Sequence, residues 1–144
     1  MMKQIAAAIT VVLATCHAAH AEVRELTQAG LRTAIVDNRA IPSFELINAV
    51  EVHTGEPVVH VRAFDVSGAV IYRVLIKQKG GALGAILLDG ESGHVVLPST
   101  RVGQKIAEFA GTVAPAATGS EGHPLRIVRD PMAYTYGPQM DLNE

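Results

Sequence analysis

The chain is poor in the side chains on which covalent catalysis and metal binding often depend. Its 144 residues contain a single cysteine, Cys16, which lies within the first 21 positions. Residues 22–144 therefore offer no disulfide, no thiolate nucleophile and no thiolate metal site. The side chains that remain for chemistry are histidine, serine and the carboxylates.

The chain also lacks basic runs and long apolar runs. Its formal net charge is −2, and aromatic residues are not interleaved with basic ones. Such a weakly acidic chain does not attract phosphate backbones, so we expect no nucleic-acid partner. Beyond the N-terminal segment, no apolar stretch reaches the roughly 20 residues that a spanning helix needs. We therefore expect no stable membrane insertion once that segment is cleaved.

No catalytic or metal-binding motif emerges from the side chains that remain. The four histidines of residues 22–144 are His53, His60, His94 and His123. No pair of them has the i, i+4 spacing of an HExxH zinc motif. Ser92 is followed directly by Gly93, which breaks the G-x-S-x-G pattern of a nucleophile elbow. We predict that the chain is not an enzyme and has no catalytic residue, no metal and no cofactor.

The first 21 residues have the pattern of a secretory signal peptide. A basic start at Lys3 is followed by an apolar run over 5–14 and by small residues at Ala19 and Ala21, the positions that a signal peptidase reads. The pattern predicts a periplasmic or secreted protein. Two alternatives stay open: an uncleaved anchor, and a lipoprotein modified at Cys16, for which the preceding threonine is a poor neighbour.

Two helices are predicted before the first strand. A helical rhythm of apolar positions indicates an N-terminal helical extension over residues 22–42. Ser43 is expected to cap the next helix. Gly55 is expected to end it, because glycine accepts the left-handed conformation on which helices often stop.

Three alternating patterns follow and predict strands over 58–66, 70–77 and 83–88. Ser67-Gly68 marks the turn between the first two strands. Segment 89–93 is a tight turn after the third. Residues 94–97 then either pair as a short fourth strand or continue the third strand beyond a bulge.

The C-terminal part of the chain divides into a helix and a tail. Thr100 is expected to cap a C-terminal helix within residues 99–111, whose apolar stripe suits it to cover part of the sheet. Residues 112–144 are predicted to be a flexible tail, with a linker rich in Ala, Gly, Pro and Ser at 114–122. The alternative for the tail is a docking peptide with tyrosines as anchors.

Together these elements predict an α+β fold: an antiparallel three- to four-stranded sheet with a helix packed on one face, plus flanking helices. One helix can bury only one side of the sheet, so the opposite side is left to the flanking segments or to another molecule. That side mixes apolar and basic residues. The candidate partner-binding face consists of His60, Arg62, Phe64, Arg73, Leu75 and Lys77, and Leu87 shares the same side.

Residues 43–98 combine a helix ending in glycine, a Tyr72-Arg73-Val74 strand core, and an Asp-Gly-Glu-Ser-Gly turn over 89–93 that leads to two valines. In this order they resemble the PepSY domain family. The resemblance implies a PepSY-like domain over 43–98, secreted or periplasmic in bacteria and without catalytic residues. The positions that match the family's motif, for which a structural role is expected, are Gly55, Tyr72, Asp89 and Gly93. The positions that depart from it are Ala63, Leu87 and Ser92.

The leading hypothesis for function is a non-enzymatic periplasmic binding module. By the resemblance, it would restrain a peptidase or act in cell-envelope regulation, through the open sheet face or an exposed strand edge. The basic side chains favour an acidic segment of a protein or peptide partner, such as a peptidase or an envelope sensor. The alternative is a structural or sensor accessory that works through self-association or its C-terminal tail. A small hydrolase or metal-dependent enzyme is the third hypothesis.

Overall fold

The computed structural model describes residues 22–116, so the predicted signal peptide, Cys16 and the tail beyond residue 116 lie outside the described residues. In chain order the elements are β1 (Val23–Glu25), α1 (Gln28–Val36), α2 (Ser43–Thr54), β2 (Val58–Val66), β3 (Ala69–Lys77), β4 (Leu83–Asp89), β5 (Val95–Val96) and α3 (Arg101–Ala110). An antiparallel sheet with separate helices confirms the predicted α+β class.

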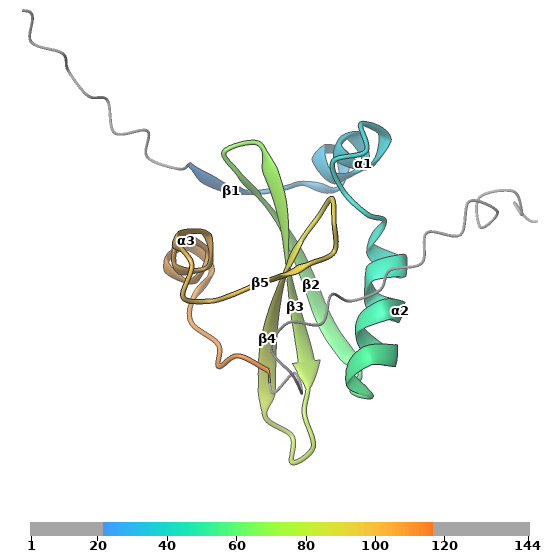
Figure 1. Ribbon diagram of the computed structural model, residues 1–144, viewed down its shortest axis with the longest axis vertical. Helices are drawn as coiled ribbons and strands as arrows, with labels where there is room; N and C mark the ends of the chain where they lie inside the picture. The colour runs from blue at the N-terminus through green and yellow to red at the C-terminus, as the bar shows by residue number, and fades with distance from the viewer. Residues whose placement is uncertain (1–21, 117–144) are drawn as a thin grey trace, which may run out of the picture.

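The five strands form one antiparallel sheet in the order β1-β2-β3-β4-β5 (Figure 1). Its three long strands match the alternating patterns to within one residue at each end. Ser67 and Gly68 have positive φ angles of 52° and 90°. Positive φ at both central residues suits a two-residue hairpin, because the turn then follows the right-handed twist of its strands.

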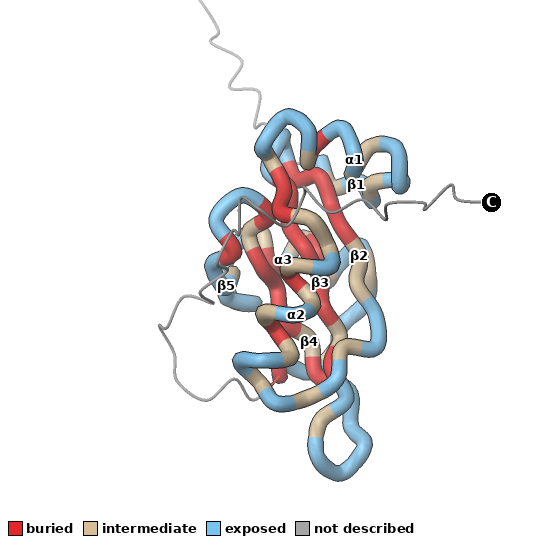
Figure 2. The backbone as a smooth tube through the Cα atoms, turned by 90° about the vertical axis from the view of Figure 1, so that its right-hand side faces the viewer, coloured by how far each residue is buried: buried red, intermediate tan, exposed pale blue. Residues whose placement is uncertain are grey.

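Helices cover both faces of this sheet: α1 and α2 lie on one side and α3 on the other (Figure 1). Buried residues run along the strands between the two helical layers (Figure 2). The core under α1 and α2 includes Leu46, Val50, Tyr72, Val74 and Leu88. The core under α3 includes Phe64, Val66, Ile71, Leu87 and Ile106.

The helical extension predicted for residues 22–42 is wrong at its start. Val23–Glu25 forms strand β1 and pairs with the last residues of β2. Helix α1 begins only after Thr27, whose side chain accepts a hydrogen bond from Gly30 N at 3.1 Å. The physical reason is that the end of β2 would otherwise be an unpaired sheet edge. A periodic pattern within residues 22–42 does not reveal that a strand distant in sequence pairs with them.

Helix α2 begins at Ser43, so Ser43 is its first residue and Pro42 occupies the cap position. The predicted cap was therefore misplaced by one residue, because Pro42 O already accepts the N–H groups of Glu45 and Leu46, at 3.1 and 3.2 Å. The predicted end is confirmed. Gly55 has φ 69°, and its N–H donates to Glu51 O at 2.8 Å.

The turn after β4 brings β5 back onto the sheet edge. Asp89 Oδ1 accepts hydrogen bonds from Ser92 N at 2.8 Å and Ser92 Oγ at 2.7 Å. Gly93 adopts a φ of 74°, which only glycine reaches without strain. Val95–Val96 then pairs with β4, so the short fourth strand is the correct alternative of the two.

The first residues of the predicted flexible linker are instead part of the sheet edge. Ala85 N donates to Ala114 O at 2.9 Å, and Ala116 N donates to Ala85 O at 3.0 Å. Gly84 allows this close approach, since a Cβ there would lie 2.7 Å from the Cα of Ala116. The linker prediction failed here because composition alone does not reveal a docked backbone.

Candidate functional site

The side chains of the predicted binding face do project from one side of the sheet. Residues directly opposite each other in an antiparallel pair point to the same side. Arg62 is opposite Arg73, and His60 is opposite Leu75. Helix α3 also lies on this side, however, and it divides the face into a covered and an uncovered part.

The covered part contradicts the prediction that this face is unshielded. Phe64 is fully buried, Arg73 is 6% exposed and Leu87 is 8% exposed. Ile106 of α3 packs in one cluster with Phe64 and Leu87, and Phe109 meets the Phe64 ring edge-on with 5.9 Å between the ring centroids. The reason is that α3 lays its apolar stripe over these residues. Phe64 and Arg73 are therefore removed from the candidate contact surface.

Arg73 holds the end of α3 to the sheet. Its Nη1 donates to Ala110 O and its Nη2 to Gly111 O, both at 2.9 Å. These are carbonyl groups at the helix C-terminus, where the helix dipole favours a cation. Within residues 22–116, Arg73 forms no ion pair. Burial, and then the positive charge of Arg62, lower the pKa of the Arg73 guanidinium.

The uncovered part, which we call the open half-face, lies beyond the part that α3 covers, toward the turn between β3 and β4. It consists of His60, Arg62, Leu75, Lys77, Leu83 and Ala85. His60 and Lys77 are exposed, Leu83 is 48% exposed, and the others are intermediate. Leu83 and Ala85 were not among the residues predicted for this face. Alternation from Leu87, already placed on this side, would have found both.

Arg62 is neutralised within the chain. Its Nε donates to Glu25 Oε1 at 2.9 Å and its Nη2 to Glu25 Oε2 at 2.5 Å, a bidentate ion pair between β2 and β1. The hydrogen bond from Arg62 lowers the pKa of Glu25. His60 and Lys77 make no ion pair within residues 22–116. Lys77 is therefore the unpaired charge that the open half-face presents to a partner, with the imidazole of His60 on the same surface.

The strand edges offer less room than expected for an added strand. On β4, the edge is occupied by β5 and by segment 114–116. On β2, a bulge interrupts the register at Val58/His60, and Glu51 Oε1 accepts the N–H of Val58 at 2.9 Å. Bulges and covered ends discourage edge-to-edge pairing. The open half-face is therefore a better contact surface than either edge.

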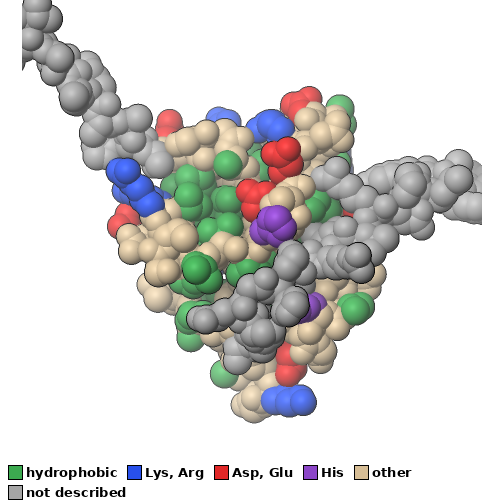
Figure 3. Space-filling model, in the orientation of Figure 1, with side chains coloured by type: hydrophobic (Ala, Val, Ile, Leu, Met, Phe, Trp, Pro, Cys, Tyr) green, Lys and Arg blue, Asp and Glu red, His purple; other side chains and the backbone are tan. Residues whose placement is uncertain are grey.

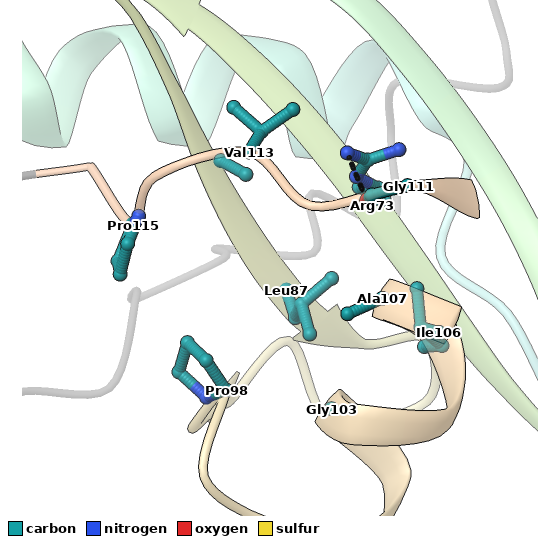
Figure 4. Close-up of a pocket in the computed structure, with 10 residues that line it drawn as sticks. Arg73, Leu87, Pro98, Gly103, Ile106, Ala107, Gly111, Val113 and Pro115 are labelled. Atoms are coloured by element: carbon teal, nitrogen blue, oxygen red, sulfur yellow. Dashed lines mark hydrogen bonds between the residues drawn. The ribbon is translucent and has the colours of Figure 1, made fainter. Parts of the chain in front are cut away.

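A small pocket opens at the junction of α3, β3 and β4 (Figure 4). Its volume is about 40 Å³, far below the roughly 300–1,000 Å³ of sites for drug-sized ligands. It is lined by Arg73, Ala85, Leu87, Pro98, Gly103, Ile106, Ala107, Gly111, Val113 and Pro115. Among the lining residues that the structure describes, Arg73 alone is charged.

The positions of the family motif make local structural contacts away from the open half-face. Tyr72 donates from its hydroxyl to Ile41 O at 2.5 Å, which fixes the α1–α2 connection to the opposite side of the sheet. Gly55 ends α2, while Asp89 and Gly93 shape the turn before β5. None of these contacts calls for a ligand.

Within residues 22–116, no group of three or more histidine, cysteine or acidic side chains is arranged to hold a metal ion. In the same part of the chain, no helix is both long and apolar enough to cross a membrane. Neither the family models, nor the curated proteins, nor the solved structures compared with this chain match it. The resemblance to the PepSY family therefore stays a prediction that rests on residues 43–98.

Proposed function

We propose that this chain is a non-enzymatic binding module of the bacterial cell envelope, periplasmic or secreted, that holds an acidic and partly apolar segment of another protein. The contact surface is the open half-face. The PepSY resemblance suggests what such binding would achieve, namely restraint of a peptidase or regulation in the envelope.

The observation that carries this proposal is the position of an unneutralised cation, Lys77, among accessible apolar side chains. His60 and Lys77 flank Leu75, and Leu83 lies directly opposite Lys77. An apolar contact supplies affinity, while the charge of Lys77 favours an acidic partner and speeds its approach. Because exposed charges are screened by salt, we expect binding to weaken as ionic strength rises.

Charge reversal on the open half-face tests this proposal. We expect Lys77→Glu to weaken capture of the native partner by about tenfold or more, measured by crosslinking in the periplasm and quantitative recovery. Arg32→Glu is the matched control, since Arg32 is an exposed cation on α1, at the other face of the sheet. Equal recovery with both variants would show that the open half-face is not the contact surface.

One observation favours the alternative, an accessory protein that works through self-association. Val95, Leu97 and Phe109 are 38%, 54% and 52% exposed on or beside α3. Apolar side chains gather over this side of the molecule (Figure 3). The alternative predicts a dimer in sedimentation that Phe109→Asp dissociates. If deleting 117–144 abolishes capture and Lys77→Glu does not, the tail is the binding element.

A further inference from the structure

We propose that the pocket beside Arg73 is a carboxylate site, which receives an acidic group of the bound partner on a short aliphatic stem. The inference rests on the proposed function and extends it from a preference for acidic segments to a defined subsite. Two sources share this chemistry: a glutamate side chain and the C-terminal carboxylate of a peptide.

The pocket adjoins the open half-face. Ala85 belongs to both. Arg73 precedes Leu75 by two residues on β3, so the two side chains lie on the same side of the sheet. The guanidinium approaches from β3, while Ile106, Ala107 and Val113 supply apolar walls from α3 and the segment after it (Figure 4). A partner segment bound to the open half-face would therefore meet the pocket where it approaches α3.

The charge in the pocket has no counter-ion in the described part of the chain. Arg73 is 6% exposed and is bound only to two neutral carbonyl oxygens. The charged group nearest to it in the sheet is Arg62, directly opposite and of the same sign. Buried cations are ordinarily paired with an anion, because taking an isolated charge out of water is costly. A carboxylate would supply the missing charge.

Arg73 retains donors for such a ligand. A guanidinium carries five N–H groups, and the two hydrogen bonds to α3 use only its Nη atoms. Nε makes neither of these bonds, and each Nη group carries a second N–H, so the guanidinium that lines the pocket has N–H groups left for a ligand. Guanidinium and carboxylate groups match in geometry, often through two parallel hydrogen bonds.

The size of the pocket selects the ligand. Its volume of about 40 Å³ corresponds to about three water molecules, at roughly 10–15 Å³ each. That is enough for a carboxylate and one or two carbons. A phosphate would face apolar walls with oxygens that Arg73 alone does not satisfy. The walls fit an aliphatic stem instead.

Propionate is the probe for this site, and propionamide is its neutral isostere. We expect propionate, added to the isotope-labelled full chain at constant ionic strength, to shift the backbone amides of Ala85, Leu87 and Ala107 in a saturable way. Propionamide should bind at least about tenfold more weakly, because it lacks the charge that Arg73 recognises. Equal binding of the two probes, or no binding of propionate, would overturn the inference.

Two variants assign the binding to the pocket. Ala107→Leu fills the pocket while keeping the Arg73 charge, and should abolish the propionate shifts. Arg73→Gln keeps a donor for α3 but removes the charge, and should weaken propionate by about tenfold. If Arg73→Gln fails to fold, Ala107→Leu still decides the matter. Undiminished binding to a folded Ala107→Leu chain contradicts the pocket.

Short alanine peptides identify the source of the carboxylate. One carries a free C-terminus, and the other is amidated and has a glutamate in its middle. The peptide that displaces propionate identifies which kind of carboxylate the pocket receives. If neither displaces it, the pocket does not serve a partner segment and the inference fails. The capture experiment with Lys77→Glu is independent of these results, so failure here is distinguishable from failure of the proposed function.

Discussion

Replacing Arg73 with glutamate should lower the free energy of unfolding by about 3–5 kcal/mol. The substitution removes both hydrogen bonds to the end of α3 and buries a carboxylate against the carbonyl oxygens of Ala110 and Gly111. The partly negative carbonyl oxygens repel the carboxylate, and the cation directly opposite, Arg62, is already paired with Glu25. Chemical denaturation, followed by circular dichroism, measures the loss.

Lys77→Glu is the matched control for stability. It makes the same charge reversal on the same side of the same strand, but Lys77 is exposed. A change within about 0.5 kcal/mol is expected there, as for most surface substitutions. If Arg73→Glu proves as mild as Lys77→Glu, then Arg73 is not buried under α3 and the division of the face is wrong.

The second large effect concerns Tyr72 and alkaline pH. Burial raises the pKa of Tyr72 to about 12, from its ordinary value of 10.0. The folded protein therefore keeps the phenol proton between these values, while the unfolded chain loses it. Stability from this group is complete below pH 10.0 and falls as the pH rises toward about 12, by roughly 2–3 kcal/mol in all.

Tyr72→Phe isolates that contribution. At neutral pH the variant should be less stable by about 1–3 kcal/mol, because Ile41 O loses its donor in a buried position. The gap between the two proteins should then narrow above pH 10.0, since only the tyrosine protein has this proton to lose. Denaturation midpoints across alkaline pH give the comparison, and a constant gap would mean that Tyr72 is not the titrating group.

Local pattern was sufficient for the elements that are defined by their own residues. The strand pair around Ser67-Gly68 and the helix after Thr100 both emerge from alternation, helical spacing and capping chemistry. Thr100 does accept the N–H of Gly103 at 3.1 Å, and Gly111 follows the helix. In each case the determining contacts lie within a few residues along the chain.

The parts that failed depend on contacts between distant residues. Strand β1 forms by pairing with the end of β2, where Arg24 lies opposite Asp65, and the backbone of segment 114–116 is bound to Ala85. In both cases the partner lies outside the few neighbouring residues that a local sequence pattern covers. The same holds for Arg73, whose place in an alternating strand predicts its side of the sheet but not the helix end that buries it. Which part of the sheet is exposed therefore depends on how the helices pack on it, and the strand pattern alone does not reveal this.

Two leucines on one strand provide the most direct measurement of the central claim, which is that α3 closes one part of this face and leaves the other open. Leu83 and Leu87 lie on the same side of β4, 48% and 8% exposed. With Cys16 replaced by serine, Leu83→Cys and Leu87→Cys can be labelled by a thiol reagent in the folded state. We predict that Leu83→Cys reacts nearly as fast as in denaturant, and Leu87→Cys at least about a hundredfold more slowly. Similar rates at the two positions would contradict the account.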